Sequence, residues 1–440
     1  MKKIAFNTLG CKVNQADTAS MEVLFSTAGY VVVDFSDEAD VYLINTCVVT
    51  NEGQRKSRQM INRVIRQHPK AIIVVTGCYP QTAFEEVANI AGVDVVVGNM
   101  DRQQIVGLVE KAIISKNSGV INGVKAFAGD DVFDDLSVGN VHERTRAFLK
   151  IQEGCNQFCT YCIIPYARGG LRSRSLEGIS TEVTKLVGDG YREIVLIGIH
   201  LGCYGKEKGD VTLFDAVQTA LNVDGVERLR LGSLESVEVE ERLLELMAKD
   251  LRLCRHLHLP LQSGCDKILN LMHRPYNTEK FEQLISKIRQ KIPDIAITTD
   301  VIVGFPGETE QDFDETMNFV KKIGFAKMHI FPYSKRCGTP AANFAGQLTE
   351  AEKALRVKQL GILDIEMQKA FMQSMIGKTV QVLFEQETDT GCIEGHSGNY
   401  QLVCCEGNAS MVNKIAEVEI VGIKGKKLFG KIKNFIERGK

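Results

Sequence analysis

The chain has 440 residues, and its 53 Lys and Arg nearly balance its 55 Asp and Glu, giving a formal net charge of −2 at pH 7. This balance excludes a global attraction to nucleic acid, so any such partner must be bound by local basic patches. The length predicts about two to four domains. Apolar runs such as 71–75 have strand length, far short of a membrane span, so we expect no membrane association.

The chain contains 13 cysteines, an odd count. Their placement in motifs favours metal ligation in a reducing compartment over disulfide bonds, so we expect a cytoplasmic protein without a disulfide framework. The first residues, MKKIAFNTLGC, contain only a short apolar stretch before Asn7 and do not match a secretory signal.

Residues 1–116 are predicted to form an open parallel α/β sheet. Short apolar strands alternate with helical stretches, which is the pattern of a parallel sheet with crossover helices. The predicted strands are 4–8, 41–44, 72–75 and 93–97, and the predicted helices include 16–28 and 54–67.

Three cysteines each follow one of these strands. Cys11 lies in NTLGCKVN, Cys47 in INTCVVT and Cys78 in VTGCYPQ. Because ligands bind at the carboxyl edge of open parallel sheets, we expect the three thiols to converge into a metal site. That site would be one thiolate short of the four that a 4Fe-4S cluster normally takes. The alternative is that cysteine, which is commonly buried, ends these strands by chance.

Residues 117–143 are rich in Gly, Asp and Asn with weak periodicity, which predicts a linker. Residues 144–375 then contain six strand-then-helix units, which predict a (β/α)6 partial TIM barrel followed by a long connecting helix over 350–375. The predicted strands are 148–152, 194–199, 228–231, 256–261, 296–303 and 327–332, with helices over 180–188, 238–249, 278–291 and 310–322. Polar, glycine-rich segments follow the strands, so one shared pocket is expected at their carboxyl ends.

A run of three cysteines, EGCNQFCTYCIIP, follows the first barrel strand. Cys155, Cys159 and Cys162 have C-x3-C-x2-C spacing with no fourth cysteine close behind, so a 4Fe-4S cluster here would keep one iron without a protein ligand. The alternatives are a zinc knuckle and an unrelated buried cysteine cluster. Zinc sites usually close with four Cys or His ligands, and the nearest histidines lie outside the run.

Residues 376–440 are predicted to form a small all-β, OB-like module, because β-rich runs at 380–384, 391–393, 400–403 and 416–421 are separated by turn residues. Such barrels often bind oligonucleotides, and Lys426, Lys427 and Lys431 would give this one a basic rim that contacts RNA. The alternative is a dimerisation or capping domain. A second basic run, 55–70, is interpreted on its own as a solvated helix face.

The cysteine run with its adjacent Tyr161 closely resembles the signature of radical S-adenosylmethionine (radical SAM) enzymes, in which the open iron chelates the methionine end of SAM. Nearly the whole chain resembles the methylthiotransferase family. Cys11, Cys47 and Cys78 match the ligands of its auxiliary 4Fe-4S cluster, and 376–440 resembles its TRAM module, implied to bind RNA. The segments LKIQEGCNQFCTYCIIPYARG, NTCVVTNEGQRKSR, TGCYPQ and FPYSKRCGTPAA look most like the branch acting on threonylcarbamoyladenosine in transfer RNA.

This resemblance implies an enzyme that inserts a methylthio group at carbon 2 of that adenine, next to the anticodon, using SAM and two 4Fe-4S clusters. No side-chain acid or base is strong enough to break this C–H bond heterolytically, so we expect none in that role and radical chemistry delegated to cofactors. Our hypothesis is that one SAM methylates a sulfur held on the auxiliary cluster, while a second is cleaved to a 5′-deoxyadenosyl radical that activates the base. The implied partners are transfer RNA, an electron donor such as flavodoxin or ferredoxin, and a sulfur donor.

The same resemblance implies SAM contacts at the carboxyl ends of the barrel strands. The candidates are the backbone around Tyr161, Gly198, Ser233, Glu235, Gln262 and Val303. The segment that continues from Gly198 to His200 lacks the acidic residue often found there in the family, so the contact to the amino group of SAM is not assigned.

Three arginines after the cysteine run are candidates to hold phosphate or the carboxylate of the modified base, because the guanidinium group has forked donors. They are Arg168, Arg172 and Arg174, and the alternative is a solvated loop. Three histidines are either polar pocket groups or ordinary core and surface residues: His200, His256 and His258.

Three further cysteines, Cys203, Cys265 and Cys337, also follow barrel strands. A third metal or sulfur-relay site is not needed by chemistry with six ligands, and cysteine packs readily, so we interpret them as packing residues. The cysteines of the last module, Cys392, Cys404 and Cys405, are given the same interpretation.

Two other classes of function stay open. A related radical SAM enzyme would keep both clusters but act on isopentenyladenosine in transfer RNA or on an aspartate of a ribosomal protein. A non-catalytic iron–sulfur RNA-binding protein would bind RNA and produce no 5′-deoxyadenosine from SAM. The open iron of the cysteine run argues against the second class.

Overall fold

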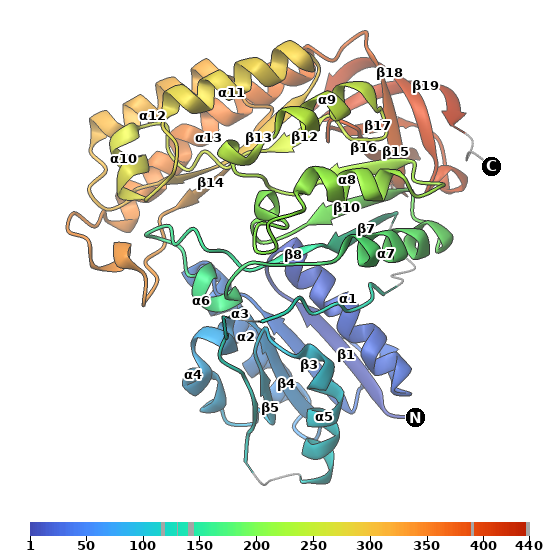
Figure 1. Ribbon diagram of the computed structural model, residues 1–440, viewed down its shortest axis with the longest axis vertical. Helices are drawn as coiled ribbons and strands as arrows, with labels where there is room; N and C mark the ends of the chain where they lie inside the picture. Colours follow the sequence, from blue (N-terminus) through green and yellow to red (C-terminus); the bar gives the residue numbers. More distant parts are fainter. Residues whose placement is uncertain (116–118, 130, 140–144, 389–390, 437–440) are drawn as a thin grey trace.

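The computed structural model describes residues 1–115, 119–129, 131–139, 145–388 and 391–436. The blue amino-terminal domain lies below the green and yellow barrel in Figure 1, and the red carboxyl-terminal module packs beside the barrel. The expected linker over 117–143 and its boundary at 144 lie partly outside the described residues.

The amino-terminal domain is an open sheet of six parallel strands in the order β2-β1-β3-β4-β5-β6. Its strands are β1 (Lys3–Thr8), β2 (Val31–Val33), β3 (Val41–Thr46), β4 (Ile72–Gly77), β5 (Val95–Val97) and β6 (Ile121–Gly123). Its helices are α1 (Lys12–Thr27), α2 (Asn51–Gln67), α3 (Cys78–Thr82), α4 (Phe84–Ala88) and α5 (Ile105–Ile114). Strands β3 and β4 are buried along their whole length, as central strands covered on both faces must be.

The sequence located this sheet correctly but not all its ends. Helix α1 begins at Lys12, directly after Cys11, so the expected start at 16 was too late. Strand β6 lies inside the stretch expected as a linker and pairs with β5, so the sheet extends beyond residue 116. Its short segment, Ile121–Gly123, is too brief to show a strand pattern before it is paired.

The central domain confirms the partial barrel. Strands β7 (Arg146–Lys150), β10 (Glu193–Ile197) and β11 (Arg228–Leu231) form one parallel sheet, and β12 (His256–His258), β13 (Ala296–Val303) and β14 (Lys327–Pro332) form another. Parallel bridges, including one between Ser233 and His258, join the two sheets into one curved wall of six strands in chain order.

The barrel helices are α6 (Ile164–Arg168), α7 (Leu176–Gly188), α8 (Leu213–Leu221), α9 (Glu241–Lys249), α10 (Asp266–Leu271), α11 (Thr278–Lys291), α12 (Glu310–Ile323) and α13 (Glu350–Gln373). Several begin at a residue whose side chain accepts a backbone N–H and so satisfies the open first turn. These N-caps are Ser175, Asn277, Thr309 and Thr349. Beside β7, β8 (Gln152–Glu153) and β9 (Arg172–Ser173) form a short antiparallel pair.

The carboxyl-terminal module is a closed barrel in the order β15-β16-β17-β19-β18. Its strands are β15 (Thr379–Glu387), β16 (Cys392–Ser397), β17 (Leu402–Glu406), β18 (Ile415–Lys424) and β19 (Lys427–Ile436). The small all-β expectation is confirmed, but β19 was not expected, because its lysines were interpreted only as a basic rim. Pairing of β19 with both β17 and β18 closes the barrel and leaves no open sheet edge.

Both end domains contact the central barrel. Val13 and Ala16 of α1 pack against Val195 and Ile197 of β10, so the amino-terminal domain covers one side of the curved wall. The guanidinium of Arg230 in β11 donates to backbone carbonyls of 397 and 398 in the last module. The barrel is therefore held from two sides.

Candidate metal centres

The first three cysteines lie at the edge of the amino-terminal sheet that faces the barrel. Cys11 caps α1, Cys47 follows β3, and Cys78 opens α3 directly after β4. They interact: burial, followed by the neighbouring Cys78 and Cys11 thiols, raises the pKa of Cys47 to about 11. Gly10, at φ +109°, permits this approach, since a Cβ there would lie 2.8 Å from Cys47 Cβ.

Arg168 lies among these cysteines with none of its side chain exposed. It donates to Cys78 Sγ (3.3 Å), Asp17 Oδ2 (2.8 Å) and Glu153 Oε1 (3.1 Å). It also contacts Asn14. Its donors are therefore used inside the protein, and the expectation that Arg168 holds phosphate or the modified base was wrong for this structure.

The second three cysteines lie between β8 and α6. The backbone N–H of Cys155 donates to Gly169 O (2.9 Å), and that of Cys162 donates to Cys159 O (2.9 Å), which folds the run into a compact loop. Burial first, and then the Cys159 and Cys155 thiols, raise the pKa of Cys162 to about 12. Gly154 packs on Gly170 O so closely that only glycine fits there.

The donor sets fit iron–sulfur clusters better than single ions. Thiols with raised pKa values become thiolates only when a nearby cation compensates the charge, and iron does so. Around one zinc ion the sulfurs would lie about 3.8 Å apart, given its ~2.3 Å bonds. Among the described residues, two groups have possible ligand atoms that all lie within 4.8 Å of one another, and neither group is one of the two cysteine sets. The thiols of each cysteine set are therefore spaced more widely than that. A larger centre suits both sets.

Arg274 is a functional candidate that the sequence reasoning missed. It follows α10, and its guanidinium donates to Cys159 Sγ (3.1 Å) and Tyr276 Oη (3.1 Å) and pairs with Glu235. Only 2% of its side chain is exposed. No spacing signal marks Arg274, because it reaches the cysteine run from a residue far along the chain.

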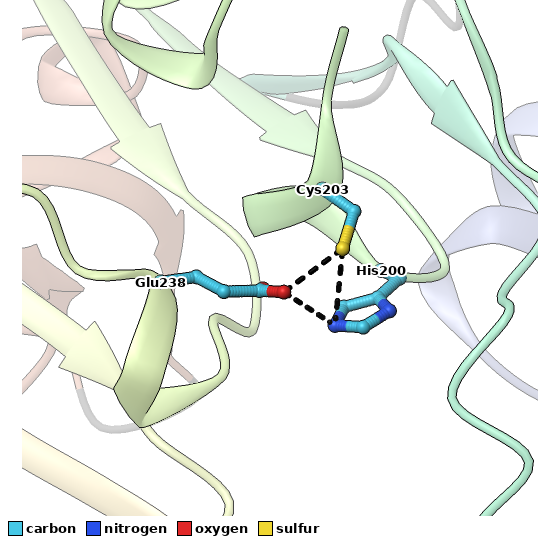
Figure 2. A group of neighbouring side chains, drawn as sticks. All are labelled: His200, Cys203 and Glu238. Atoms are coloured by element: carbon cyan, nitrogen blue, oxygen red, sulfur yellow. Dashed lines mark hydrogen bonds and ion pairs between the residues drawn. The ribbon is translucent and has the colours of Figure 1, made fainter. Parts of the chain in front are cut away.

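His200, Cys203 and Glu238 form a buried group beside Cys155, and Figure 2 shows their side chains pointing toward one another. His200 Nε2 lies 3.1 Å from Glu238 Oε1, which also accepts from Cys203 Sγ (2.8 Å). The other ring nitrogen, Nδ1, lies 3.4 Å from Cys155 Sγ. His200 is thus a pocket residue in contact with the cysteine run.

The expected SAM contacts differ in accessibility and in their partners. Ser233 is exposed and follows β11, while Glu235 pairs with Arg274. Tyr161 packs edge-on to Phe305, with ring centroids 6.5 Å apart. These residues stay candidates for SAM binding.

Three other expected SAM contacts are constrained by the fold. Gln262 has φ +66°, a strained backbone conformation for a residue other than glycine. Its N–H donates to Asp300 O and its carbonyl accepts from Ile302 N–H, so it pairs with β13 beyond the end of β12. A Cβ on Gly198 would meet Gln152 Oε1 at 2.8 Å, so this glycine approaches the chain itself. Val303 is 1% exposed and belongs to the hydrophobic core, and its carbonyl accepts from the backbone N–H of Tyr333 at 2.8 Å.

The remaining basic candidates divide by exposure. Arg172 and Arg174 are each 3% exposed; Arg172 donates to Arg168 O and Arg174 to Leu136 O. This burial contradicts both the phosphate contact and the solvated loop expected for them. Of the module lysines, Lys426 and Lys431 are exposed, whereas Lys427 pairs with Glu394.

The other histidines and cysteines do not join either set. His256 and His258 both contact Thr298 Oγ1 inside the barrel. Cys203 and Cys265 belong to separate groups and Cys337 is exposed. All thirteen cysteines are free of disulfides.

Two family models match the chain: the uncharacterized protein family UPF0004 over residues 3–98, and the radical SAM superfamily over residues 149–320. The chain is 43% identical over 426 residues to threonylcarbamoyladenosine tRNA methylthiotransferase MtaB of Bacillus subtilis, covering 96% of this chain and 94% of that protein. It belongs to the radical SAM methylthiotransferase family.

Other similar proteins have the same or a related name. A protein of the same name from Aquifex aeolicus is 42% identical, covering 88% of this chain and 93% of its own. A tRNA-2-methylthio-N(6)-dimethylallyladenosine synthase of Pelotomaculum thermopropionicum is 35% identical, covering 96% of both chains. The structure of the radical SAM methyltransferase TsrM from Kitasatospora setae shares the fold, with TM-score 0.57 and 14% identity over 77% of this chain and 74% of that one.

Membership of this family establishes an enzyme that uses SAM and a 4Fe-4S cluster. Within the part of the chain that the structure describes, every helix is too short or too polar to cross a membrane.

Proposed function

We propose that the protein inserts a methylthio group at carbon 2 of threonylcarbamoyladenosine in transfer RNA. One observation carries this proposal: helix α6 connects the two cysteine sets. It starts just after Cys162, and its last residue, Arg168, donates to Cys78 Sγ at 3.3 Å. The six residues from 163 to 168, five of them in the helix, advance roughly 9 Å at a helical rise. Figure 1 places α6 beside α3 at the junction of the two domains.

Two centres this close can act on one substrate. We assign Cys155, Cys159 and Cys162 to the cluster that binds SAM, and Cys11, Cys47 and Cys78 to an auxiliary cluster. Bound there, the first cluster would supply the electron for reductive cleavage of SAM, and the second would supply a site for the sulfur to be transferred. We assign Ser233, Gln262 and the backbone near Tyr161 to the binding of SAM at the first site; Ser233 is exposed just beyond the end of β11.

The rest of the chain supports a transfer RNA substrate. Lys426 and Lys431 are exposed on the small barrel, where they would contact phosphate. The higher identity to relatives named for threonylcarbamoyladenosine than to those named for dimethylallyladenosine favours the first base. The reaction needs an electron donor such as flavodoxin or ferredoxin and a sulfur donor, and we place it in the cytoplasm.

Nucleoside analysis tests the substrate. Transfer RNA from a strain lacking the gene should lose the methylthio group on threonylcarbamoyladenosine and regain it when the wild-type gene is restored. Loss of the group from isopentenyladenosine, or from a ribosomal protein aspartate, would identify the alternative substrates. Unchanged transfer RNA and ribosomal protein would leave a non-catalytic protein as the better account.

Anaerobic reconstitution tests the two centres. Replacing Cys11, Cys47 and Cys78 by Ala should halve the bound iron, keep cleavage of SAM to 5′-deoxyadenosine and abolish methylthiolation. Replacing Cys155, Cys159 and Cys162 should abolish cleavage. Cys337→Ala is the matched control, since this exposed cysteine lies outside both sets. Loss of SAM cleavage in the first variant with methylthiolation intact would reverse the assignment.

A further inference from the structure

Cys155, Cys159 and Cys162 are called the Cys155 set below. Two of its three thiols contact a nitrogen-bearing side chain, an arginine or a histidine, that is itself paired with a carboxylate. Arg274 donates to Cys159 Sγ at 3.1 Å and pairs with Glu235. His200 Nδ1 lies 3.4 Å from Cys155 Sγ, and Nε2 lies 3.1 Å from Glu238 Oε1. Both carboxylates come from one short segment after β11, whereas His200 follows β10 and Arg274 follows α10, so three separate segments build the two pairs.

Burial makes these contacts electrostatically strong. The Arg274 side chain is 2% exposed and that of His200 is 7% exposed. In such surroundings the effective dielectric constant is low, and a charge close to a sulfur changes its electrostatic potential more than it would in water. In each pair one nitrogen contacts the sulfur and another contacts the carboxylate: Nη1 and Nη2 of Arg274, and Nδ1 and Nε2 of His200.

The surroundings hold both donors in one place. Tyr276 Oη accepts from Arg274 Nε at 3.1 Å, and the Arg274 guanidinium lies 5.1 Å from the ring centre of Tyr276. The backbone N–H of His200 donates to Gln152 Oε1 at 2.6 Å, and Cys203 donates to Glu238 on the other side of the ring. These contacts restrict the movement of both side chains and keep their nitrogens close to the sulfurs.

We propose that Arg274 and His200 are positioning residues that donate hydrogen bonds to Cys159 and Cys155 and thereby raise the reduction potential of the cluster those cysteines bind. This inference rests on the proposed function, which places the SAM-binding cluster here. The reduced cluster carries one more negative charge than the oxidised one, so donors at its sulfurs stabilise the reduced form. Neither side chain needs to touch SAM or the substrate base.

A potentiometric titration of the reconstituted full-length protein tests the inference. Sodium dithionite supplies the single electron, and electron paramagnetic resonance follows the reduced cluster; the signal that changes on adding SAM identifies the Cys155 set. The variants are R274Q/E235Q and H200F/E238Q, which remove the guanidinium or the imidazole together with its carboxylate so that no buried charge is left unpaired. Each should shift the midpoint to more negative values, by about 59 mV for a ten-fold change in the equilibrium.

The matched control is R192Q/E227Q. Arg192 and Glu227 form a similarly buried pair, with 7% and 14% of their side chains exposed, but lie just before β10 and β11, at the opposite strand ends. The control should keep the wild-type midpoint. Iron content and the melting temperature of each variant show whether a shift reflects the cluster or a damaged fold.

Different results would overturn the inference and the proposed function. Both double variants with full iron content and an unchanged midpoint would overturn the inference. If R274Q/E235Q holds less iron, the midpoint potentials of R274K and H200F/E238Q test the inference instead. Lysine at 274 keeps the positive charge but loses the forked donors of the guanidinium. A wild-type midpoint potential in both variants would reject the hydrogen-bond role. A wild-type protein without any SAM-responsive cluster would overturn the proposed function itself, and this inference with it.

Discussion

Arg168 holds a permanent positive charge with none of its side chain exposed. Such a charge is tolerated only when it is fully paired, and Asp17 and Glu153 pair with it at 2.8 and 3.1 Å. Lys150 contacts the same two carboxylates, at 2.5 and 2.8 Å. Since Asp17 lies on α1 and the others on the barrel, this network ties the two domains together beside Cys78.

Replacing Arg168 by Met should therefore destabilise the protein strongly. Glu153 would lose its strongest partner, and Asp17 would keep Arg102 and Lys150 but lose its third cation. Breaking a buried ion pair from one side typically costs about 3–5 kcal/mol. We expect a lower free energy of unfolding in urea and less iron bound by the Cys11, Cys47 and Cys78 set. R172M, which leaves the carboxylates paired, is the control. An R168M protein of wild-type stability with weakened binding of transfer RNA would instead support the original phosphate role.

At the level of residues, the sequence indicated the six cysteines because their spacing and strand-end positions are local patterns. It could not indicate the burial of Arg168 or the contact of Arg274 with Cys159. Both depend on which domain covers the cysteines, and pairing between distant segments leaves no local signature. The arginines were therefore assigned to a loop that the structure shows to be an interior.

Helix α12 shows how local rules position an element. Thr309 and Asp312 form a capping box at its start, and Lys267 pairs with Asp312 at 2.6 Å. Burial opposes charge on Asp312, but the bonds from Lys267 and Thr309 outweigh it and lower its pKa from 3.8 to about 2. Because the folded pKa is the lower one, this carboxylate stabilises the fold above pH 4, and the contribution is lost as the pH falls to about 2.

Replacing Asp312 by Asn should thus cost about 1–2 kcal/mol at pH 7. The difference from wild type should stay constant from pH 7 to 5 and shrink as the pH falls from 4 toward 2, where the wild-type carboxylate is also neutral. Urea unfolding at each pH measures it. D314N, at an exposed position of the same helix, is the control. A gap that stays unchanged at low pH would contradict the lowered pKa.

The hairpin of β18 and β19 contains the exposed lysines of the small barrel. Lys427 and Lys433 are paired with Glu394 and Glu419, whereas Lys426 and Lys431 face solvent. The variant K426A/K431A should weaken binding of transfer RNA and reduce the slope of log affinity against log salt by about 1.5. The variant K427A/K433A should change the slope less. Equal effects of the two variants would argue for diffuse attraction over a defined contact.

Elements were predictable where a pattern is local and long. Strands β3 and β4 begin with continuous apolar runs and β13 is rich in β-branched residues, and the sequence located all three within a few residues. Strand β19 alternates lysines with apolar residues, and its role appears only when β17 and β18 lie on either side. Its pairing depends on tertiary contacts that no window of sequence contains.

At the scale of the whole molecule, the small barrel is locked to the central one by Tyr400. Its ring lies 4.6 Å from the Arg230 guanidinium and stacks on His396 at 4.9 Å. His256 of β12 approaches it at 5.0 Å. Arg228 and Arg230 share Glu193 and donate to carbonyls of 396–398, so the contact closes the barrel at the amino ends of its strands. The cysteine sets lie at the other end, which leaves that end for substrate.

Replacing Tyr400 by Ala should separate these domains without emptying the metal sites. Truncation of the ring removes contacts with both barrels and should cost about 2–3 kcal/mol. Calorimetry should then resolve two unfolding transitions where the wild type shows one, and limited proteolysis should cut near the end of α13 faster. Iron content should be unchanged, because no cysteine of either set contacts Tyr400. If Y400A lost iron instead, the last module would be part of the metal centre's support, and the two ends of the barrel would be coupled.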